Sequence, residues 1–230
     1  MKGKLFGLGV GPGDPELLTI KALRMIQESD IVAVPGSEVK ESVAYQIVKG
    51  VYEELDSKNL IPIAMPMTKD PAVLEANHKK AADDIEGYLQ EGKQVAFLTL
   101  GDPTVYSTYL YVHKRILERG YEAEIVSGIT SFCAVAAKLN MGLVEMAEPL
   151  HVIPATYNAE EMDRVLQLPG TKVLMKTGKK MKQVRESILR SGQKAVMIEN
   201  CGMPSEKIYE TAEAIPEEAG YYSLIIVKEN

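Results

Sequence analysis

Apolar residues fall along this chain in short runs, separated by longer stretches in which apolar positions recur with helical spacing. In the first half, the candidate strands cover residues 5–10, 31–34, 60–64, 95–98 and 122–126. Short strands with helices between them are typical of a sheet whose two faces are both covered. The pattern predicts a mostly parallel, right-handed doubly wound α/β sheet. Pro62 lies inside the third run and places that strand near an edge of the sheet.

Two Asp-Pro pairs mark expected helix starts. Asp14 and Asp70 can each cap a helix whose first position is the proline that follows. The second of these helices is expected to run to about Gln90 and to be closed by Gly92. A further helix is expected over residues 106–119, ending at Gly120.

The second half of the chain has a different pattern. Residues 151–153, 172–175, 194–198 and 222–227 are strand-like, and helices are expected over residues 132–138, 160–167 and 179–190. A polar stretch, without one clear amphipathic helix, separates the last two strands. This arrangement predicts a mixed sheet and hence a second α/β domain. The expected division is residues 1–119 and 120–230.

Composition narrows the class of protein. The chain has 230 residues, of which 46% are hydrophobic and 25% charged, as in an ordinary globular protein. A formal net charge of −6 argues against nonspecific binding of nucleic acid. No apolar stretch approaches the length of a membrane span, so a cytoplasmic protein is expected. The two cysteines, Cys133 and Cys201, and three scattered histidines predict neither a disulfide framework nor a metal site.

The strand at residues 95–98 enters the loop Leu100-Gly101-Asp102-Pro103. Open α/β sheets bind ligands just beyond the carboxyl ends of their strands, and glycine lets the backbone approach a ligand closely. Taken alone, Gly-Asp-Pro favours an ordinary strand-to-helix turn over a binding site.

The glycine-rich loop after the first strand does not read as a dinucleotide site. A G-x-G-x-x-G pattern starting at Gly9 requires glycine where Asp14 stands, and Pro12 removes one backbone amide. An aspartate there would also repel a pyrophosphate at the helix start.

Several of these segments together resemble the tetrapyrrole methylases. Residues 9–19 (GVGPGDPELLT), the Gly101-Asp102-Pro103 loop and Gly128-Ile129-Thr130-Ser131 occur in the order and spacing of that family. One branch, the precorrin-2 (cobalt-factor II) C20-methyltransferases, is similar at residues 98–108 (LTLGDPTVYST), 131–134 (SFCA), 199–203 (ENCGM) and 221–224 (YYSL). The resemblance covers essentially the whole chain.

The resemblance implies an S-adenosylmethionine-dependent methyltransferase of class III type, with two α/β domains and a cleft between them. It also implies a homodimer. The cofactor contacts that it implies are Leu100, Gly101, Asp102, Val105, Tyr106, Thr130 and Ser131, followed by Met175, Asn200, Cys201, Tyr222, Ser223 and Leu224. It places Gly11, Pro12, Gly13 and Asp14 on the side of the tetrapyrrole substrate.

The implied substrate carries many carboxylates, so basic residues should line its site. The candidates are Lys21, Arg24, Lys69, His78 and Lys176. Methyl transfer needs mainly orientation and the exclusion of water, and a base is optional. Asp102 and Tyr106 are the nearest candidates for a catalytic role.

Three functions remain open from the sequence. The first is methylation of C20 on precorrin-2 or cobalt-factor II. The second is another methyl transfer of the same family, to a different ring carbon or to a protein or RNA acceptor. The third is a non-catalytic sensor of S-adenosylmethionine. The sequence leaves open whether the macrocycle already holds cobalt.

Overall fold

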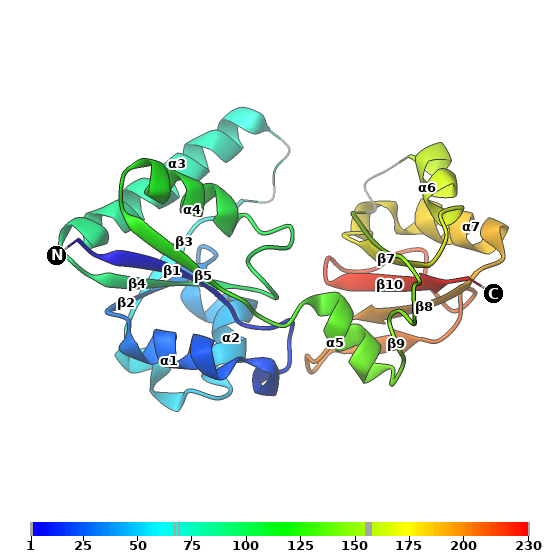
Figure 1. The fold of residues 1–230 in the computed structure, drawn as a ribbon, viewed down its shortest axis with the longest axis horizontal. Helices are drawn as coiled ribbons and strands as arrows, with labels where there is room; N and C mark the ends of the chain where they lie inside the picture. The colour runs from blue at the N-terminus through cyan, green and yellow to red at the C-terminus, as the bar shows by residue number, and fades with distance from the viewer. Residues whose placement is uncertain (1, 67, 69, 155–157, 230) are drawn as a thin grey trace. The chain divides into compact units, whose positions relative to one another are not determined.

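The computed structural model describes residues 2–66, 68, 70–154 and 158–229. The chain forms two compact units, Met1–Thr130 and Ser131–Asn230 (Figure 1). In its described part, each unit contains a five-stranded sheet. The expectation of two α/β domains, one parallel and one mixed, is confirmed.

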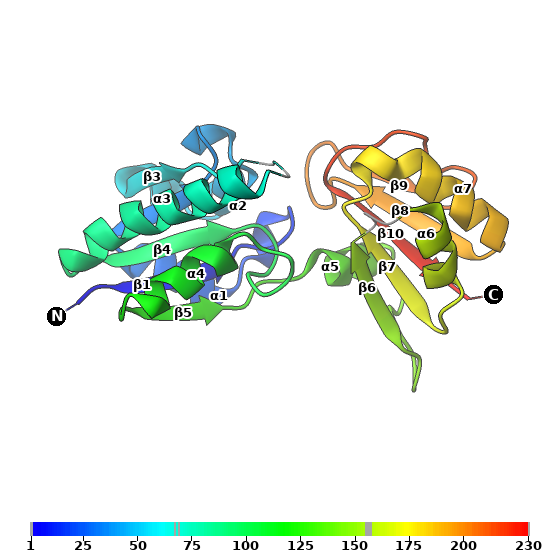
Figure 2. The same cartoon turned by 90° about the horizontal axis from the view of Figure 1, so that it is seen from above.

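The N-terminal sheet is parallel throughout. Its strands run in the order β3-β2-β4-β1-β5, so β3 and β5 form the two edges (Figure 2). Every pair in this sheet is parallel. The edge position predicted for the strand with Pro62 is confirmed. The bounds are β1 Lys4–Gly9, β2 Ile31–Pro35, β3 Asn59–Ile63, β4 Gln94–Thr99 and β5 Glu122–Val126.

Helices cover both faces of the N-terminal sheet (Figure 1). On one face, α1 (Ile20–Glu28) and α2 (Val43–Lys49) bury a core that includes Leu8 and Leu98. On the other face, α3 (Pro71–Gln90) and α4 (Tyr109–Glu118) bury a core that includes Phe97. Successive strand residues therefore serve opposite cores, which explains the continuous apolar runs.

Two helix starts differ from expectation. Asp14 Oδ1 accepts a hydrogen bond from Glu16 N at 2.9 Å, but this closes only a short 3₁₀ turn, Pro15–Leu17. Helix α1 begins later, where Thr19 provides the capping oxygen. Tyr106 does not begin a helix, because its backbone is left-handed with φ +50°, and α4 starts at Tyr109. The Asp70 cap and the helix Pro71–Gln90 are as predicted.

The C-terminal sheet has the order β6-β7-β10-β8-β9. Strands β6 and β7 are parallel, and the remaining pairs are antiparallel. Helices α6 and α7 cover one face and α5 the other (Figure 1). The short strand β9 was not predicted. The bounds are α5 Ser131–Lys138, β6 Leu150–Pro154, α6 Ala159–Leu166, β7 Thr171–Met175, α7 Met181–Ser191, β8 Lys194–Glu199, β9 Lys207–Tyr209 and β10 Ser223–Lys228.

The division between the units falls at residues 130/131, not near Gly120. The reason is that β5 pairs with β1 along its length, from Lys4↔Glu122 to Leu8↔Val126, and so belongs to the N-terminal sheet. A helix end at Gly120 is therefore only a turn inside the first unit. Within the described ranges, no helix has both the length and the apolar character needed to cross a bilayer.

Candidate active site

Two glycine-containing loops lie side by side at the carboxyl edge of the N-terminal sheet. Gly101 N donates a hydrogen bond to Gly11 O at 2.8 Å, and Gly11 N donates to Gly101 O at 3.3 Å. This antiparallel bridge joins the loop after β1 to the loop after β4. The structure therefore brings the predicted substrate-side and cofactor-side loops of this unit together.

Glycine is required where these loops meet backbone to backbone. A Cβ atom built on Gly9 would lie 2.7 Å from Gly101 O, and one built on Gly128 would lie 2.7 Å from Gly9 C. Real Cβ atoms do not approach backbone that closely. Gly9 and Gly128 thus permit close packing of three strand ends, a role that does not need a ligand.

Gly101 differs from these two glycines. Its φ is +70°, and the nearest atom to a Cβ built there is Ile129 O at 3.9 Å. The α-carbon of Gly101 faces space that a side chain would fill. A ligand can therefore approach this backbone closely.

The carboxylate of Asp102 is buried and accepts three hydrogen bonds. Oδ2 accepts from Gly128 N at 2.9 Å, while Oδ1 accepts from Thr104 N at 2.7 Å and from Thr104 Oγ1 at 2.5 Å. A carboxylate has about four acceptor positions, so most of its capacity is already used. This geometry assigns Asp102 to holding the loops after β4 and β5. Thr104 was missed from the sequence, although an Asp side chain in a turn commonly accepts from the backbone N–H two residues on.

Tyr106 combines a strained backbone with an exposed ring. Its φ of +50° is uncommon for a residue with a side chain, and 44% of its surface is exposed. Such strain persists only where surrounding structure enforces it, and it clusters at functional sites. Val105 lies between Tyr106 and the Asp102 turn and donates its N–H to Asp102 O at 3.2 Å. Leu100 packs against the α1/α2 core.

The C-terminal residues of the predicted set gather at one edge of their own sheet. Strand β10 is antiparallel to both β7 and β8, so it begins where those two strands end. Met175 pairs with Leu224, and Glu199 pairs with Ser223. Asn200 and Cys201 directly follow β8, and Asn200 N donates to Tyr222 O at 2.9 Å.

The side chains at this edge differ in what they offer a ligand. Leu224 and Ser223 are buried, and Ser223 Oγ donates to Gly220 O at 2.6 Å. Any contact from these two residues would use their backbone. Tyr222 is 39% exposed and packs edge to face with Tyr221. Thr130 is half-buried, and Ser131 is the first residue of α5.

Family models identify the chain. The model "Tetrapyrrole (Corrin/Porphyrin) Methylases" matches residues 4–216. The chain belongs to the tetrapyrrole methylase family. This confirms the resemblance drawn from the glycine loops.

Named relatives come from the same family. A probable cobalt-precorrin-2 C(20)-methyltransferase of Methanocaldococcus jannaschii is 42% identical over 175 residues, covering 76% of this chain and 72% of the relative. The cobalt-precorrin-2 C(20)-methyltransferase of Salmonella typhimurium is 32% identical over 232 residues, covering 99% and 97% of the two chains.

A solved structure shares the fold. The uroporphyrin-III C-methyltransferase of Thermus thermophilus, complexed with S-adenyl homocysteine, matches with a TM-score of 0.72. The match covers 99% of this chain and 98% of the other, at 21% identity, so it bears on the fold alone.

The basic residues expected at the substrate site of this tetrapyrrole methylase lie in different environments. Lys21 Nζ pairs with Glu124 Oε1 at 2.8 Å, and Arg24 pairs with Glu28 at 3.4 Å. His78 is buried and stacks on Tyr111, and burial lowers the pKa of its imidazole. Lys69 lies outside the described residues. Lys176 directly follows β7, at the edge where Met175 and Tyr222 lie.

Two further features of the methylase were not foreseen. Lys176 and Asn200 have left-handed backbones, with φ of +59° and +55°. The hydroxyls of Thr99, at the end of β4, and Thr177 are buried and have no hydrogen-bond partner among the described residues. Local sequence gives no signal for either feature, because both depend on tertiary packing.

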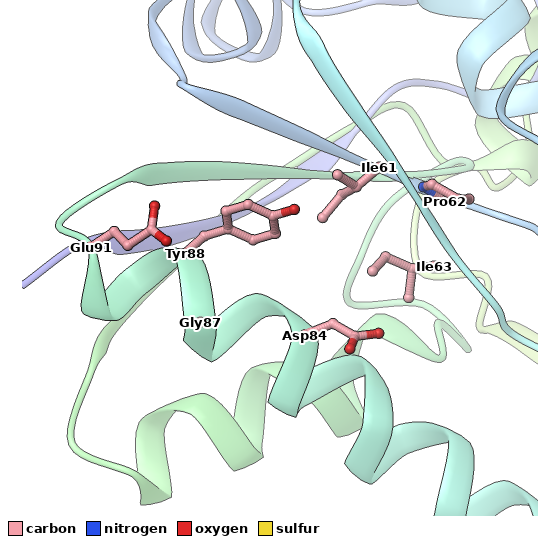
Figure 3. Close-up of a pocket in the computed structure, with 7 residues that line it drawn as sticks. All are labelled: Ile61, Pro62, Ile63, Asp84, Gly87, Tyr88 and Glu91. Carbon is pink, nitrogen blue, oxygen red and sulfur yellow. The ribbon is translucent and has the colours of Figure 1, made fainter.

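A pocket with a volume of about 500 Å³ lies between the edge strand β3 and helix α3 (Figure 3). Its lining includes Ile61, Tyr88 and the carboxylates of Asp84 and Glu91. None of the residues predicted for the methylase site is among them. The pocket is a separate feature, formed at the edge of the N-terminal sheet. Asp84 in its lining is paired with Lys80 Nζ at 2.8 Å. Among the side chains described, no group of three His, Cys, Asp or Glu residues could hold a metal ion.

Proposed function

We propose that this chain is an S-adenosylmethionine-dependent methyltransferase that methylates C20 of precorrin-2 or cobalt-factor II. The observation that carries the proposal is its 42% identity, over 76% of its length, to a relative named for this reaction. Family membership over residues 4–216 and the open α-carbon face of Gly101 support it. Assays with precorrin-2 and with cobalt-factor II distinguish a metal-free substrate from one that already holds cobalt.

Each unit contributes its own cofactor contacts. In the N-terminal unit, Gly101 offers backbone that a ligand can approach, and Tyr106, farther along the same loop, offers an exposed ring. In the C-terminal unit, the edge formed by the ends of β7 and β8 offers backbone groups and the ring of Tyr222. The full proposed set is Leu100, Gly101, Asp102, Val105, Tyr106, Thr130, Ser131, Met175, Asn200, Cys201, Tyr222, Ser223 and Leu224.

The chemistry asks the protein chiefly to position two reactants. S-adenosylmethionine, when bound, supplies an electrophilic methyl group on its sulfonium. The chain's residues orient the nucleophilic C20 carbon in line with that methyl group and exclude water. Asp102 keeps the loops after β4 and β5 in place, because its carboxylate holds donors from both. The proton that later leaves C20 needs no strong base, and the Tyr106 hydroxyl is our candidate for any group that assists.

The decisive assay incubates the protein with methyl-labelled S-adenosylmethionine and a set of tetrapyrroles. We expect label on precorrin-2, on cobalt-factor II, or on both, and carbon NMR of the product locating it at C20. Label on another ring carbon would keep the family activity but change the position. Cofactor binding without transfer to any tetrapyrrole would instead favour a sensor.

We also propose a homodimer, on the family resemblance, and a cytoplasmic location, as expected from the sequence. A sequence hint for the dimer is the apolar and aromatic run Tyr106, Tyr109, Leu110 and Tyr111, which is more than one buried helix face needs. The structure changes this hint. Tyr109 is 1% exposed and belongs to the core, whereas Tyr111 and Leu117 on α4 are about half exposed. Light scattering at micromolar concentration tests this, and a monomer mass would end the proposal.

A further inference from the structure

The corner where β8 ends and β10 begins is closed by a carboxylate outside the proposed cofactor set. Glu199, the last residue of β8, is half-buried, and its Oε1 accepts a hydrogen bond from Gly220 N at 2.6 Å. Ser223 Oγ donates to the carbonyl oxygen of the same glycine at 2.6 Å. Glu199 and Ser223 are themselves paired across the two strands. The three residues thus form a closed ring of contacts at this end of the sheet.

This ring holds the turn that carries two partly exposed tyrosines. Tyr221 and Tyr222 lie between Gly220 and Ser223, and their rings pack edge to face with centroids 5.2 Å apart. Asn200 N donates to Tyr222 O at 2.9 Å, so the end of β8 contacts the turn at two places. The end of β8 therefore determines where this turn lies.

The chain leading into the turn is anchored to helix α7. Arg185 Nε donates to Ile215 O at 2.6 Å, and Arg185 Nη2 donates to Glu213 O at 3.2 Å. Residues 216–219 connect this anchor to Gly220. The hydrogen bond from Gly220 to Glu199 therefore fixes the second end of a segment whose first end is already held.

The close approach of the carboxylate explains the glycine at position 220. A Cβ atom built there would lie 2.8 Å from Glu199 Oε1, whereas the φ of Gly220 is not in the left-handed range. The N-terminal unit has a similar arrangement, in which Asp102, just beyond β4, accepts from Gly128 N at 2.9 Å. In each unit, a carboxylate at a strand end holds the amide of a glycine in a neighbouring segment.

We propose that Glu199 is a positioning residue for the methyl donor, which keeps the Tyr221–Tyr222 turn in the conformation that binds the cofactor. The inference rests on the proposed function, in which Tyr222 and Ser223 belong to the cofactor site. Glu199 acts through Gly220 and not by contact with the reacting atoms. Without the carboxylate, the turn spends part of its time in other conformations, and the apparent Kd for the cofactor rises as the binding-competent fraction falls.

Three substitutions of Glu199 separate position from charge. Glu199→Ala removes the acceptor, and we expect the Kd for S-adenosylhomocysteine in calorimetry to rise about 3- to 10-fold. The factor is modest because the hydrogen bond is accessible to water. Glu199→Gln keeps an acceptor oxygen, so its Kd should stay within about twofold of the parent value. Glu199→Asp withdraws the carboxylate by one methylene group and should resemble Glu199→Ala.

Gly220→Ala tests the same contact from the other side. Its methyl group should displace the flexible end of Glu199 without straining the backbone, so folding should be unaffected. The Kd should rise as in Glu199→Ala, and the double variant should bind no more weakly than either single variant. Gly220→Ala also takes the place of Glu199→Ala if that variant fails to fold.

The matched control is Glu148→Ala, at the opposite end of the same sheet. The Glu148 carboxylate also accepts a backbone N–H, from Glu145 at 3.2 Å, and it accepts from Thr171 Oγ1, at the start of β7, at 2.6 Å. Its removal should lower the urea midpoint at least as much as Glu199→Ala does and leave the Kd unchanged. In turnover, Glu199→Ala should raise KM for S-adenosylmethionine and keep kcat within about twofold, because saturating donor selects the competent turn.

Hydrogen exchange tests the positioning without a ligand. A peptide covering residues 216–224 should exchange faster in Glu199→Ala than in the parent or in Glu199→Gln. An unchanged Kd in both Glu199→Ala and Gly220→Ala would overturn the inference. A loss in Glu199→Gln as large as that in Glu199→Ala would overturn it as well, since charge and not position would then matter. If the parent binds S-adenosylhomocysteine but methylates no tetrapyrrole, the proposed function fails, and the Kd values of the variants still decide the inference.

Discussion

The amide of Gly128 donates a hydrogen bond to Asp102 Oδ2 at 2.9 Å, which ties the end of β5 to the loop after β4. The other carboxylate oxygen is occupied by Thr104. An aspartate used in this way shapes a binding loop from within. Removing this carboxylate should therefore disturb the conformation of the loop more than the methyl-transfer step itself.

Asp102→Asn tests this role. The amide oxygen of the new side chain can accept a hydrogen bond either from Gly128 or from Thr104. Its NH₂ group then faces the other donor, with which it cannot form a hydrogen bond. We expect a loss of about 1–3 kcal/mol in the free energy of unfolding. At saturating cofactor, single-turnover methyl transfer should fall by no more than about tenfold, whereas a required general base is typically worth roughly a hundredfold or more.

The matched control is Asp70→Asn, because asparagine caps a helix about as well as aspartate. It should change neither stability nor rate appreciably. A loss above about a thousandfold in Asp102→Asn with unchanged cofactor affinity, or the disappearance of a pH inflection present in the parent, would make Asp102 the base.

The Gly101→Ala variant distinguishes the cost of backbone strain from the loss of space for a ligand. Gly101 and Gly120 have nearly the same backbone, with φ of +70° and +76°, and a Cβ on Gly120 meets no atom within 4 Å. Alanine at either position should lower the free energy of unfolding by about 1–2 kcal/mol. Calorimetry should show weaker S-adenosylhomocysteine binding in Gly101→Ala alone, with Gly101→Arg abolishing it. Equal affinities in the two alanine variants would remove Gly101 from the site.

Gly7 and Tyr109 should behave as a coupled pair. A Cβ on Gly7 would lie 2.5 Å from the Tyr109 hydroxyl oxygen, and the ring is buried against β1. Gly7→Ala should destabilise the protein by about 1–3 kcal/mol through overpacking. In Tyr109→Leu, the same change should cost less, giving a non-additive cycle in urea denaturation. Additive free energies would show that the ring does not set the requirement for glycine.

His78 should make the fold less stable in mild acid. Burial, assisted by Arg115 and opposed by Glu75, lowers the pKa of its imidazole below the ordinary 6.5. The unfolded chain then binds the proton more readily, so stability is lost as pH falls below about 6.5 toward the pKa of the folded state. The ring stacks on Tyr111, with centroids 4.4 Å apart, and His78→Phe keeps an aromatic partner there.

Urea denaturation midpoints measured at pH 7.5 and pH 5 test the direction of this pH dependence. The midpoint of the parent should fall more between these values than that of His78→Phe. Burial also lowers the pKa of His113, so the variant should retain a smaller slope. Equal slopes in parent and variant would show that His78 does not contribute.

Most of the strands, helix starts and loops that depend on local residue patterns were predicted from the sequence. Apolar runs located the strands, and the Asp70-Pro71 pair located the start of α3. The glycine loops led to the family and placed the predicted N-terminal residues on adjoining loops. These features depend on residue types whose conformational preferences are strong wherever they occur.

What the sequence missed depends on distant contacts. Residues 122–126 belong to the first unit because β1 pairs with them, and no residue near Gly120 signals that pairing. Tyr106, Lys176 and Asn200 adopt left-handed backbones that their types disfavour or only tolerate. Tertiary packing imposes these conformations, so residue type alone does not predict them.

The Gly11–Gly101 bridge should make the loop after β1 and the loop after β4 move together. Because each glycine both donates to and accepts from the other, a shift of one loop carries the other with it. Occupancy of the loop proposed to contact the methyl donor should therefore alter the affinity of the loop proposed to face the macrocycle, and by the same factor in reverse. Departure of the spent donor would then change the affinity for the methylated ring, which would link the release of the two products.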